Sequence, residues 1–220
     1  MKIKLTSRKG NAFTLVEMLA VIFVIVVLIV LFLPALATSG YGSNRSKRIS
    51  CVNNLKQTGL AFRIWSGDND DKFPMEISAT NADAMRLITN GNAYVLWQMM
   101  SNEFSTPKIL YCPADADHVT ATSFSSGFSD ANISYFFGLD VTTNDTQRLL
   151  VGDDNLAVND VSARTGILKL WTNSPVAWTA ARHKFVGNIG LADGSVQQLT
   201  TGGLISAISN AAAPSRLVIP

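Results

Sequence analysis

The pattern of hydrophobic and polar positions divides the chain into a short polar start, one long apolar run and a longer mixed region. The apolar run extends from Phe13 to Leu33, a stretch of 21 residues with a single charged side chain, Glu17. A helix of about 20 apolar residues spans the hydrocarbon core of a bilayer, which is roughly 30 Å thick. The pattern therefore predicts a membrane-spanning helix over residues 13–37.

A second helix is predicted beyond a polar break. Residues 38–44 contain Gly40 and Gly42 and are typical of a turn. A stripe then recurs at spacings of four, three, four and three residues, which is the period of one helix face. Its members are Cys51, Leu55, Thr58, Phe62 and Trp65. We expect residues 38–66 to form the second half of a long helix whose stripe packs against the remaining chain.

Residues 67–220 contain shorter apolar runs separated by loops rich in Ser, Asn, Asp and Thr. One run, 92–101, favours a helix, and 108–111 favours a short strand that ends at Cys112. Further strands are predicted at 134–139, 148–151, 167–171, 185–191 and 196–199. Asp193-Gly194 separates the last two runs and is a strong hairpin signal. The sequence thus predicts an α+β head in which a helix packs on a small antiparallel sheet.

Charge is placed unevenly along the chain. Lys and Arg number 18 against 16 Asp and Glu, and this near-balance argues against a nucleic-acid-binding protein. Four of the basic residues, Lys2, Lys4, Arg8 and Lys9, lie in residues 1–12, so 14 remain against 16 acidic residues beyond them. By the positive-inside rule the N-terminus should stay in the cytoplasm and the head should lie outside. The small residues Gly10 and Ala12 precede the apolar run, so a cut there would keep the membrane segment.

The order basic leader, Ala12, Phe13-Thr14-Leu15-Val16-Glu17 and long apolar run resembles the type III signal of type IV pilins and type II secretion pseudopilins. The resemblance implies that a prepilin peptidase cuts between Ala12 and Phe13 and then N-methylates Phe13. Glu17 is fifth and Pro34 is twenty-second when Phe13 is counted as first, as in the family. The family usually has Gly before the cut, whereas here Gly10 lies three residues before Phe13. Both offsets favour a cut after Ala12.

Glu17 and Pro34 have physical roles that suit such a filament. A carboxylate within an apolar helix is costly unless it is paired, and the amine of Phe13 on a neighbouring subunit could pair with it. Glu17 would then set the axial register between subunits. Pro34 removes a backbone donor and clashes with the preceding turn, so we expect it to kink or locally melt the helix.

Two further stretches resemble a large group of bacterial pseudopilin-like proteins. They are Cys51-Val-Asn-Asn-Leu-Lys-Gln57 and Tyr111-Cys112-Pro113-Ala114-Asp115. The group has a C-terminal motif of His, nine residues and Asp-Gly, which is matched here by His183, Asp193 and Gly194. His183 and Asp193 do not suggest a catalytic pair, because a strand of about 30 Å would separate them. Asp193-Gly194 is better explained as the turn between two strands.

Metal binding has limited support in the sequence. One acidic cluster holds Asp68, Asp70 and Asp71, and another is Asp153-Asp154. Carboxylates in loops suit calcium, but no full EF-hand pattern is present and turn formation explains these residues as well. Zinc is disfavoured, because the two Cys and two His show no finger spacing. We therefore expect no resident cofactor or metal, with calcium as the alternative.

The two cysteines, Cys51 and Cys112, allow one disulfide. An oxidising envelope compartment would preserve it, and it would close a loop of roughly 60 residues. Two buried free thiols are the alternative.

The expected organisation is a leader at 1–12, a transmembrane and assembly helix at 13–37, a second helix half at 38–66 and a periplasmic head at 67–220 that contains the 183–194 motif. The resemblance implies a non-catalytic subunit of a type II secretion pseudopilus or related filament. Its partners would be a prepilin peptidase and methyltransferase, other pilin-like subunits and inner-membrane lipid, with no nucleic acid. The alternatives are a type IV pilin for adhesion, motility or DNA uptake, and a membrane-anchored envelope enzyme or binding module.

Overall fold

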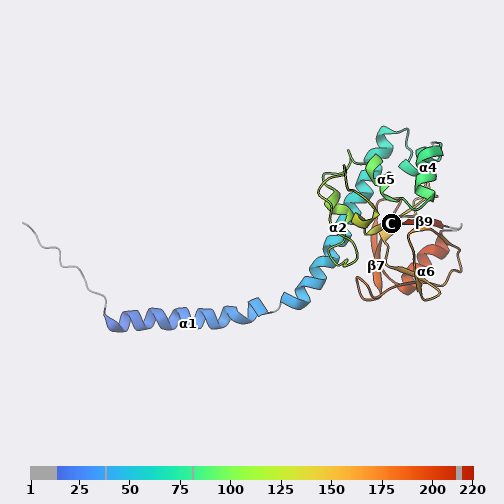
Figure 1. Cartoon of the computed structure of the whole chain (residues 1–220). Coiled ribbons are helices and arrows are strands. Elements are labelled where there is room, and N and C mark those ends of the chain that lie inside the picture. Colours follow the sequence, from blue (N-terminus) through green and yellow to red (C-terminus); the bar gives the residue numbers. More distant parts are fainter. Residues whose placement is uncertain (1–13, 38, 81, 212–214) are drawn as a thin grey trace, which may run out of the picture. The chain divides into compact units, whose positions relative to one another are not determined.

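The computed structural model describes residues 14–37, 39–80, 82–211 and 215–220 (Figure 1). The chain divides into two compact units, residues 1–43 and 44–220. The second unit, called the head from here on, contains both sheets and both hydrophobic cores.

Helix α1, Leu15–Ala37, coincides with the predicted membrane segment. Every residue from Leu15 to Phe32 is exposed, and this stretch is long and apolar enough to cross a membrane by length and composition. Pro34 lies within α1, which continues to Ala37, so the helix is not interrupted at the proline. Of the two expected effects of Pro34, local melting is therefore wrong, and a kink stays a prediction. A proline can remain in a helix because its main costs are one hydrogen bond and a local clash.

Helix α2, Ser39–Asp68, covers nearly all of the segment expected at 38–66 as the second helix half. The turn expected over 38–44 is wrong for residues 39–44, which are helical despite Gly40 and Gly42. Glycine costs a helix interior only about 1 kcal/mol relative to alanine, so two of them do not prevent helix formation. The predicted stripe does face the core. Its members Cys51, Leu55, Thr58 and Phe62 are fully buried and Trp65 is partly buried.

Short helices follow α2 along the chain. They are α3 (Pro74–Thr80), α4 (Ala82–Thr89), α5 (Tyr94–Met99), the 3₁₀ helices η1 (Pro107–Leu110) and η2 (Asp130–Asn132), and later α6 (Thr201–Asn210). The strand predicted before Cys112 is wrong, because η1 occupies that position. Pro107 has no backbone N–H for a strand ladder, whereas it suits the first position of a helical turn.

The main sheet has six antiparallel strands in the order β5-β9-β1-β2-β7-β8. Its strands are β1 (Tyr135–Gly138), β2 (Leu149–Asp153), β5 (Gly166–Leu170), β7 (Val186–Leu191), β8 (Val196–Thr200) and β9 (Ser215–Ile219). A second sheet has the order β4-β3-β6, with strands β3 (Leu156–Val158), β4 (Val161–Ser162) and β6 (Val176–Trp178). All five strands predicted from residue 134 onward are present, and the fold is α+β with antiparallel sheets.

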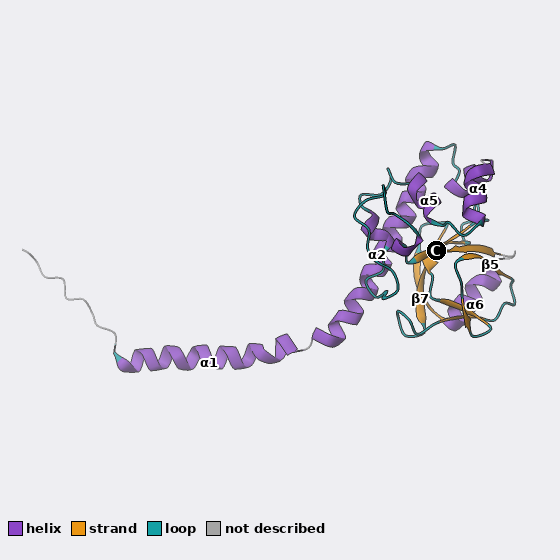
Figure 2. Cartoon of the chain, in the orientation of Figure 1, coloured by secondary structure: helices purple, strands orange, loops and turns teal. Residues whose placement is uncertain are grey.

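Figure 2 shows the strands of the head in orange. The main sheet contributes side chains to two hydrophobic clusters. On one face Tyr135 and Phe137 of β1 join the core formed with α2 and α5. On the other face Phe136 joins a core that contains Trp178 of β6 and Leu204 of α6. Alternate residues of one strand thus enter opposite cores, as strand geometry requires. A strand buried on both faces positions the polar residues at its ends within the interior of the head.

Candidate functional site

A cluster of charged and polar side chains is buried in the head where four segments meet. The loop after η1 supplies Asp115 and His118, and Ser134 lies directly before β1. The end of β2 supplies Asp153 and Asp154, and the loop before β7 supplies Arg182 and His183. Because burying a charge is costly unless it is paired, the contacts within this cluster determine what it can do.

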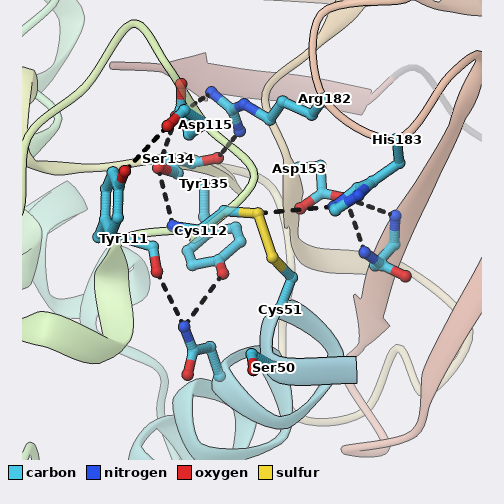
Figure 3. Close-up of a disulfide and its surroundings, with 12 residues drawn as sticks. Ser50, Cys51, Tyr111, Cys112, Asp115, Ser134, Tyr135, Asp153, Arg182 and His183 are labelled. Carbon is cyan, nitrogen blue, oxygen red and sulfur yellow. Dashed lines mark hydrogen bonds and ion pairs between the residues drawn. A yellow bond between two sulfur atoms is a disulfide. The ribbon is translucent and has the colours of Figure 1, made fainter. Parts of the chain in front are cut away.

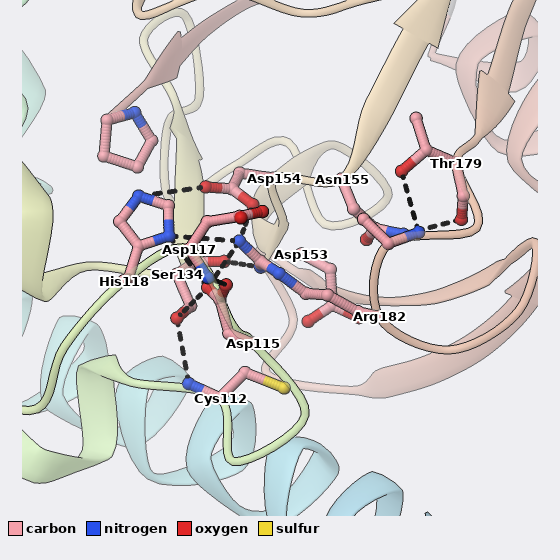
Figure 4. Close-up of polar contacts among 12 residues, drawn as sticks. Cys112, Asp115, Asp117, His118, Ser134, Asp153, Asp154, Asn155, Thr179 and Arg182 are labelled. Carbon is pink, nitrogen blue, oxygen red and sulfur yellow. Dashed lines mark hydrogen bonds and ion pairs between the residues drawn. The ribbon is translucent and has the colours of Figure 1, made fainter.

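Arg182 is the centre of the cluster (Figure 4). Its side chain is 3% exposed, and one guanidinium nitrogen lies 2.6 Å from Asp115 Oδ2 and also pairs with Asp154. Another guanidinium nitrogen donates to the backbone carbonyl of Ser134. The arginine therefore connects three segments that are far apart in the sequence, and it neutralises two buried carboxylates.

Asp115 is held as a carboxylate by several donors. His118 Nδ1 lies 2.8 Å from Asp115 Oδ2, and Ser134 Oγ donates to the same oxygen at 2.6 Å. Burial alone would raise the pKa of Asp115, but the hydrogen bonds from His118 and Ser134 and the charge of Arg182 together lower it. The hydrogen bond with Asp115 in turn raises the pKa of His118. Ser134 Oγ also accepts the backbone N–H of Cys112 at 3.0 Å, which ties this group to the disulfide.

Cys51 of α2 and Cys112 form a disulfide, with their Cα atoms 5.2 Å apart (Figure 3). His183 lies beside it, with Nε2 3.5 Å from Cys112 Sγ and 3.6 Å from Asp153 Oδ2. Burial, with the charges of Arg48 and Arg182, lowers the pKa of His183 to about 4. The imidazole is therefore neutral at neutral pH and keeps a lone pair on one ring nitrogen.

Asp153 faces this group from the end of β2 and is fully buried. Its Oδ2 accepts the backbone N–H and the side-chain amide of Asn188, both at 2.8 Å. Burial raises the pKa of Asp153 to about 6. Asp153 Oδ1 has no hydrogen-bond partner. Among the described residues, few buried side-chain polar atoms lack a partner in this way.

A cavity of about 260 Å³ adjoins the cluster on the side of Asp154. His118, Asp154, Arg182, Asn155 and Thr179 are among the residues that line it. Most charges on its wall are already paired with one another, so the wall resembles a structural ion-pair network more closely than a set of groups poised for catalysis.

The structure describes only some of the site residues predicted from the N-terminal signal. Ala12 and Phe13 lie outside the described residues. Glu17 lies in the first turn of α1, where its Oε2 accepts the backbone N–H of Thr14 at 2.8 Å and the hydroxyl of Thr14 at 2.9 Å. The Thr14 hydroxyl accepts the N–H of Glu17 at 3.2 Å, so the two residues form a reciprocal capping box.

The structure does not bring the members of the C-terminal motif together. His183 lies beside the disulfide, whereas Asp193-Gly194 forms the turn between β7 and β8. Gly194 has a φ of +83°, and Asp193 Oδ1 accepts the backbone N–H of Ser195 at 2.8 Å. Arg63 of α2 donates to the carbonyl of Asp193, so the turn is fixed to the long helix. The two ends of the motif thus contact α2 at different places, through Arg63 and, at the carbonyl of His183, through Arg48.

The two acidic clusters have different surroundings. Asp68, Asp70 and Asp71 are exposed at the end of α2 and in the turn after it. Asp153 is fully buried, Asp154 is partly buried with its side chain 7% exposed, and both belong to the polar cluster. Among the described residues, the group of three or more His, Cys, Asp or Glu side chains that could share a metal ion is Cys51, Cys112 and His183.

Sequence reasoning missed most of this cluster. It identified Cys51, Cys112 and His183, and it placed Asp115 in a motif, but it assigned no role to His118, Ser134 or Arg182. One signal in the sequence could have indicated buried charge, namely a charged side chain directly after an apolar run. Among the described residues, Asp153 after Leu149–Gly152 is an example. Comparison with known proteins adds no further assignment, since no family model, no curated protein and no solved structure matches the chain.

Proposed function

We propose that this chain is a non-catalytic structural subunit of a type II secretion pseudopilus or a related pilus-like filament, anchored in the inner membrane before assembly. The observation that carries the proposal is helix α1, in which each residue from Leu15 to Phe32 is apolar or small except Glu17, and all are exposed. An apolar surface on every side of a helix requires an apolar environment, either lipid or the equivalent helices of other subunits. A filament subunit uses both in turn.

The processing step rests on the sequence signal. A prepilin peptidase on the cytoplasmic side would cut between Ala12 and Phe13, and its methyltransferase activity would modify Phe13. The head would then lie in the periplasm, where a disulfide such as Cys51–Cys112 persists. A type IV pilin for adhesion, motility or DNA uptake shares these features. The assembly genes encoded near this chain would discriminate between the two systems.

Glu17 provides the decisive experiment. In the isolated chain its carboxylate is held by Thr14, and in a filament it would pair with the amine of a neighbouring Phe13. Glu17→Ala removes both the charge and the capping box. Glu17→Gln removes the charge but keeps a side chain that can close the same capping box. The two variants together therefore separate helix capping from charge pairing.

We expect both variants to insert into the membrane and to begin at N-methyl-Phe13 by mass spectrometry, because removing a charge eases insertion. Both should lose most of the sheared filament, since breaking one side of a buried charge pair typically costs about 3–5 kcal/mol. Normal filament yield from Glu17→Gln together with loss in Glu17→Ala would assign the effect to capping. Normal yield from both would contradict the pairing of Glu17 with a neighbouring Phe13. A wild-type chain that forms no filament, or an unprocessed chain that begins at Met1, would contradict the proposed function.

A further inference from the structure

Four residues that could bind a metal come from four segments and meet at the disulfide. Two of them are the cysteines that form it, and the other two lie beside it. Cys51 comes from α2, Cys112 follows η1, Asp153 ends β2 and His183 precedes β7. Ligand atoms of the two cysteines and His183 all lie within 4.8 Å of one another, and Asp153 Oδ2 is 3.6 Å from His183 Nε2. The four residues are between 0% and 4% exposed. In Figure 3 the imidazole and the carboxylate lie together beside the sulfur atoms.

Two of these polar groups are poorly satisfied by the protein itself. The 3.6 Å separation of His183 Nε2 and Asp153 Oδ2 is too long for a good hydrogen bond. Asp153 Oδ1 is buried and has no hydrogen-bond partner at all. A buried oxygen without a partner is costly, and a carboxylate oxygen in that state is well suited to a cation. The orphaned Oδ1 is an observation independent of the proximity of the cysteines.

The distances agree with a tetrahedral zinc site. With Zn–S near 2.3 Å and Zn–N near 2.05 Å, the sulfur-to-nitrogen edge of a tetrahedron is about 3.5 Å. The observed distance from Cys112 Sγ to His183 Nε2 is 3.5 Å. A nitrogen-to-oxygen edge would be about 3.4 Å, close to the 3.6 Å between His183 and Asp153. The two sulfur atoms must separate to about 3.8 Å when their bond is broken, and the carboxylate of Asp153, which lies outside the group of ligand atoms within 4.8 Å of one another, must approach them.

We propose that the reduced form of this chain binds one Zn²⁺ through the thiolates of Cys51 and Cys112, the imidazole of His183 and the carboxylate of Asp153, and that the disulfide is its metal-free form. A dithiol reductant would give two electrons and two protons to the disulfide and become a disulfide itself. Zn²⁺ would then displace the two thiol protons. Asn188, which donates two hydrogen bonds to Asp153 Oδ2, would orient the carboxylate beside His183.

The spacing argument against zinc in the sequence applies to fingers, whose ligands come in close pairs along the chain. Here the ligands lie on separate elements and meet only in the folded head. Either form, disulfide or zinc, would join α2 to the loop after η1. The inference is independent of filament assembly, because it concerns the interior of the head.

The test uses the full-length chain in detergent, reduced with a phosphine under anaerobic conditions and titrated with Zn²⁺ and with Co²⁺. We expect one metal per reduced chain by elemental analysis and none in the oxidised chain. Co²⁺ should give the intense visible absorption of a tetrahedral site with thiolate ligands. His183→Ala and Asp153→Asn should each weaken binding at least tenfold and alter the cobalt spectrum. His118→Ala, a histidine change in the neighbouring cluster, is the matched control and should bind as wild type does.

Two results would overturn the proposal. One is a reduced wild-type chain that binds no zinc. The other is binding that is equally strong and spectrally identical in wild type, His183→Ala and Asp153→Asn, because thiols of an unfolded chain would behave in that way. Folding of each variant is checked first in the oxidised form, where the disulfide remains. If one variant does not fold, the other and the zinc-dependent rise in melting temperature of the reduced wild type decide the question.

Discussion

His118 is the residue whose protonation should couple the buried cluster to pH. It is surrounded by the charged groups Asp115, Asp154, Asp130 and Arg182. The hydrogen bond with Asp115 raises the pKa of His118 in the folded protein above the unfolded value of about 6.5. A group whose pKa is raised on folding contributes stability that is fully present below the unfolded pKa. That contribution is lost as the pH rises through the folded pKa.

We therefore predict that His118→Gln destabilises the head most at pH 6 and below, and that its deficit relative to wild type narrows as the pH rises toward 9. Chemical denaturation of both proteins across this range measures the difference in unfolding free energy. The control repeats the His118→Gln change in an Asp115→Asn background and compares it with Asp115→Asn alone. Because the main group that raises the pKa of His118 is then absent, the pH dependence of the deficit should be smaller. A deficit that widens with pH would contradict the assignment of His118 as the protonated partner.

Gly194 is the second residue with a testable requirement. Its φ of +83° is costly for residues with a side chain, and an added Cβ would lie 2.8 Å from Nε of Arg63. We predict that Gly194→Ala lowers the unfolding free energy by about 1–2 kcal/mol, the typical cost of a left-handed conformation. Gly67→Ala is the matched control, because nothing lies within 4 Å of its added Cβ and it stands in the last turn of α2. The control should be neutral or slightly stabilising.

At the scale of elements, the disulfide joins α2 to the segment after η1 across a sequence separation of 61 residues. In the chain-entropy model, closing a loop of this size stabilises the fold by roughly 4 kcal/mol. We predict a loss of that order in the unfolding free energy when both Cys51 and Cys112 are replaced by serine, measured without reductant or metal. A loss below about 1 kcal/mol would mean that the packing of α2 alone holds these segments together.

Local pattern predicted the elements whose signal is contained in one short run of residues. The β7–β8 hairpin and the buried stripe of α2 are of this kind. Strand β9, Ser215–Ile219, was missed, although it lies between β5 and β1 in the main sheet. Nothing in the run itself indicates partners some 50 and 80 residues away. Helix α6 was missed as well, because Gly202 and Gly203 lie in its first turn and weaken the local signal.

The polar cluster could not be predicted for a related reason. Asp115, Asp153 and Arg182 meet because strands and loops from different parts of the chain converge, and their sequence spacing has no short period. Residues of one sequence motif do not necessarily contact each other in the fold, as His183 and Asp193 show. Spacing along the chain therefore identified turns and stripes, whereas the ligand group around the disulfide depended on tertiary structure.

At the scale of the whole molecule, the chain consists of a head with its own hydrophobic cores and an apolar helix. None of the described residues of that helix belongs to those cores. Both hydrophobic cores consist of residues from Cys51 onward. From Leu15 to Phe32, the described residues of α1 are all exposed. The stability of the head should therefore come from residues 44–220, and membrane association should come from the N-terminal segment.

We predict that a chain from which residues 1–43 are deleted, exported to an oxidising compartment by a cleavable signal, folds as a soluble protein. Its unfolding free energy should match that of the head in the full-length chain within about 0.5 kcal/mol, as expected for independent parts. The full-length chain should instead be recovered with membranes, because α1 is long enough to span them. Denaturation of both proteins in the same mild detergent makes the comparison direct. A truncated chain that aggregates or melts at a much lower temperature would show that α1 or the first turns of α2 stabilise the head, and would contradict the division of roles between the two units.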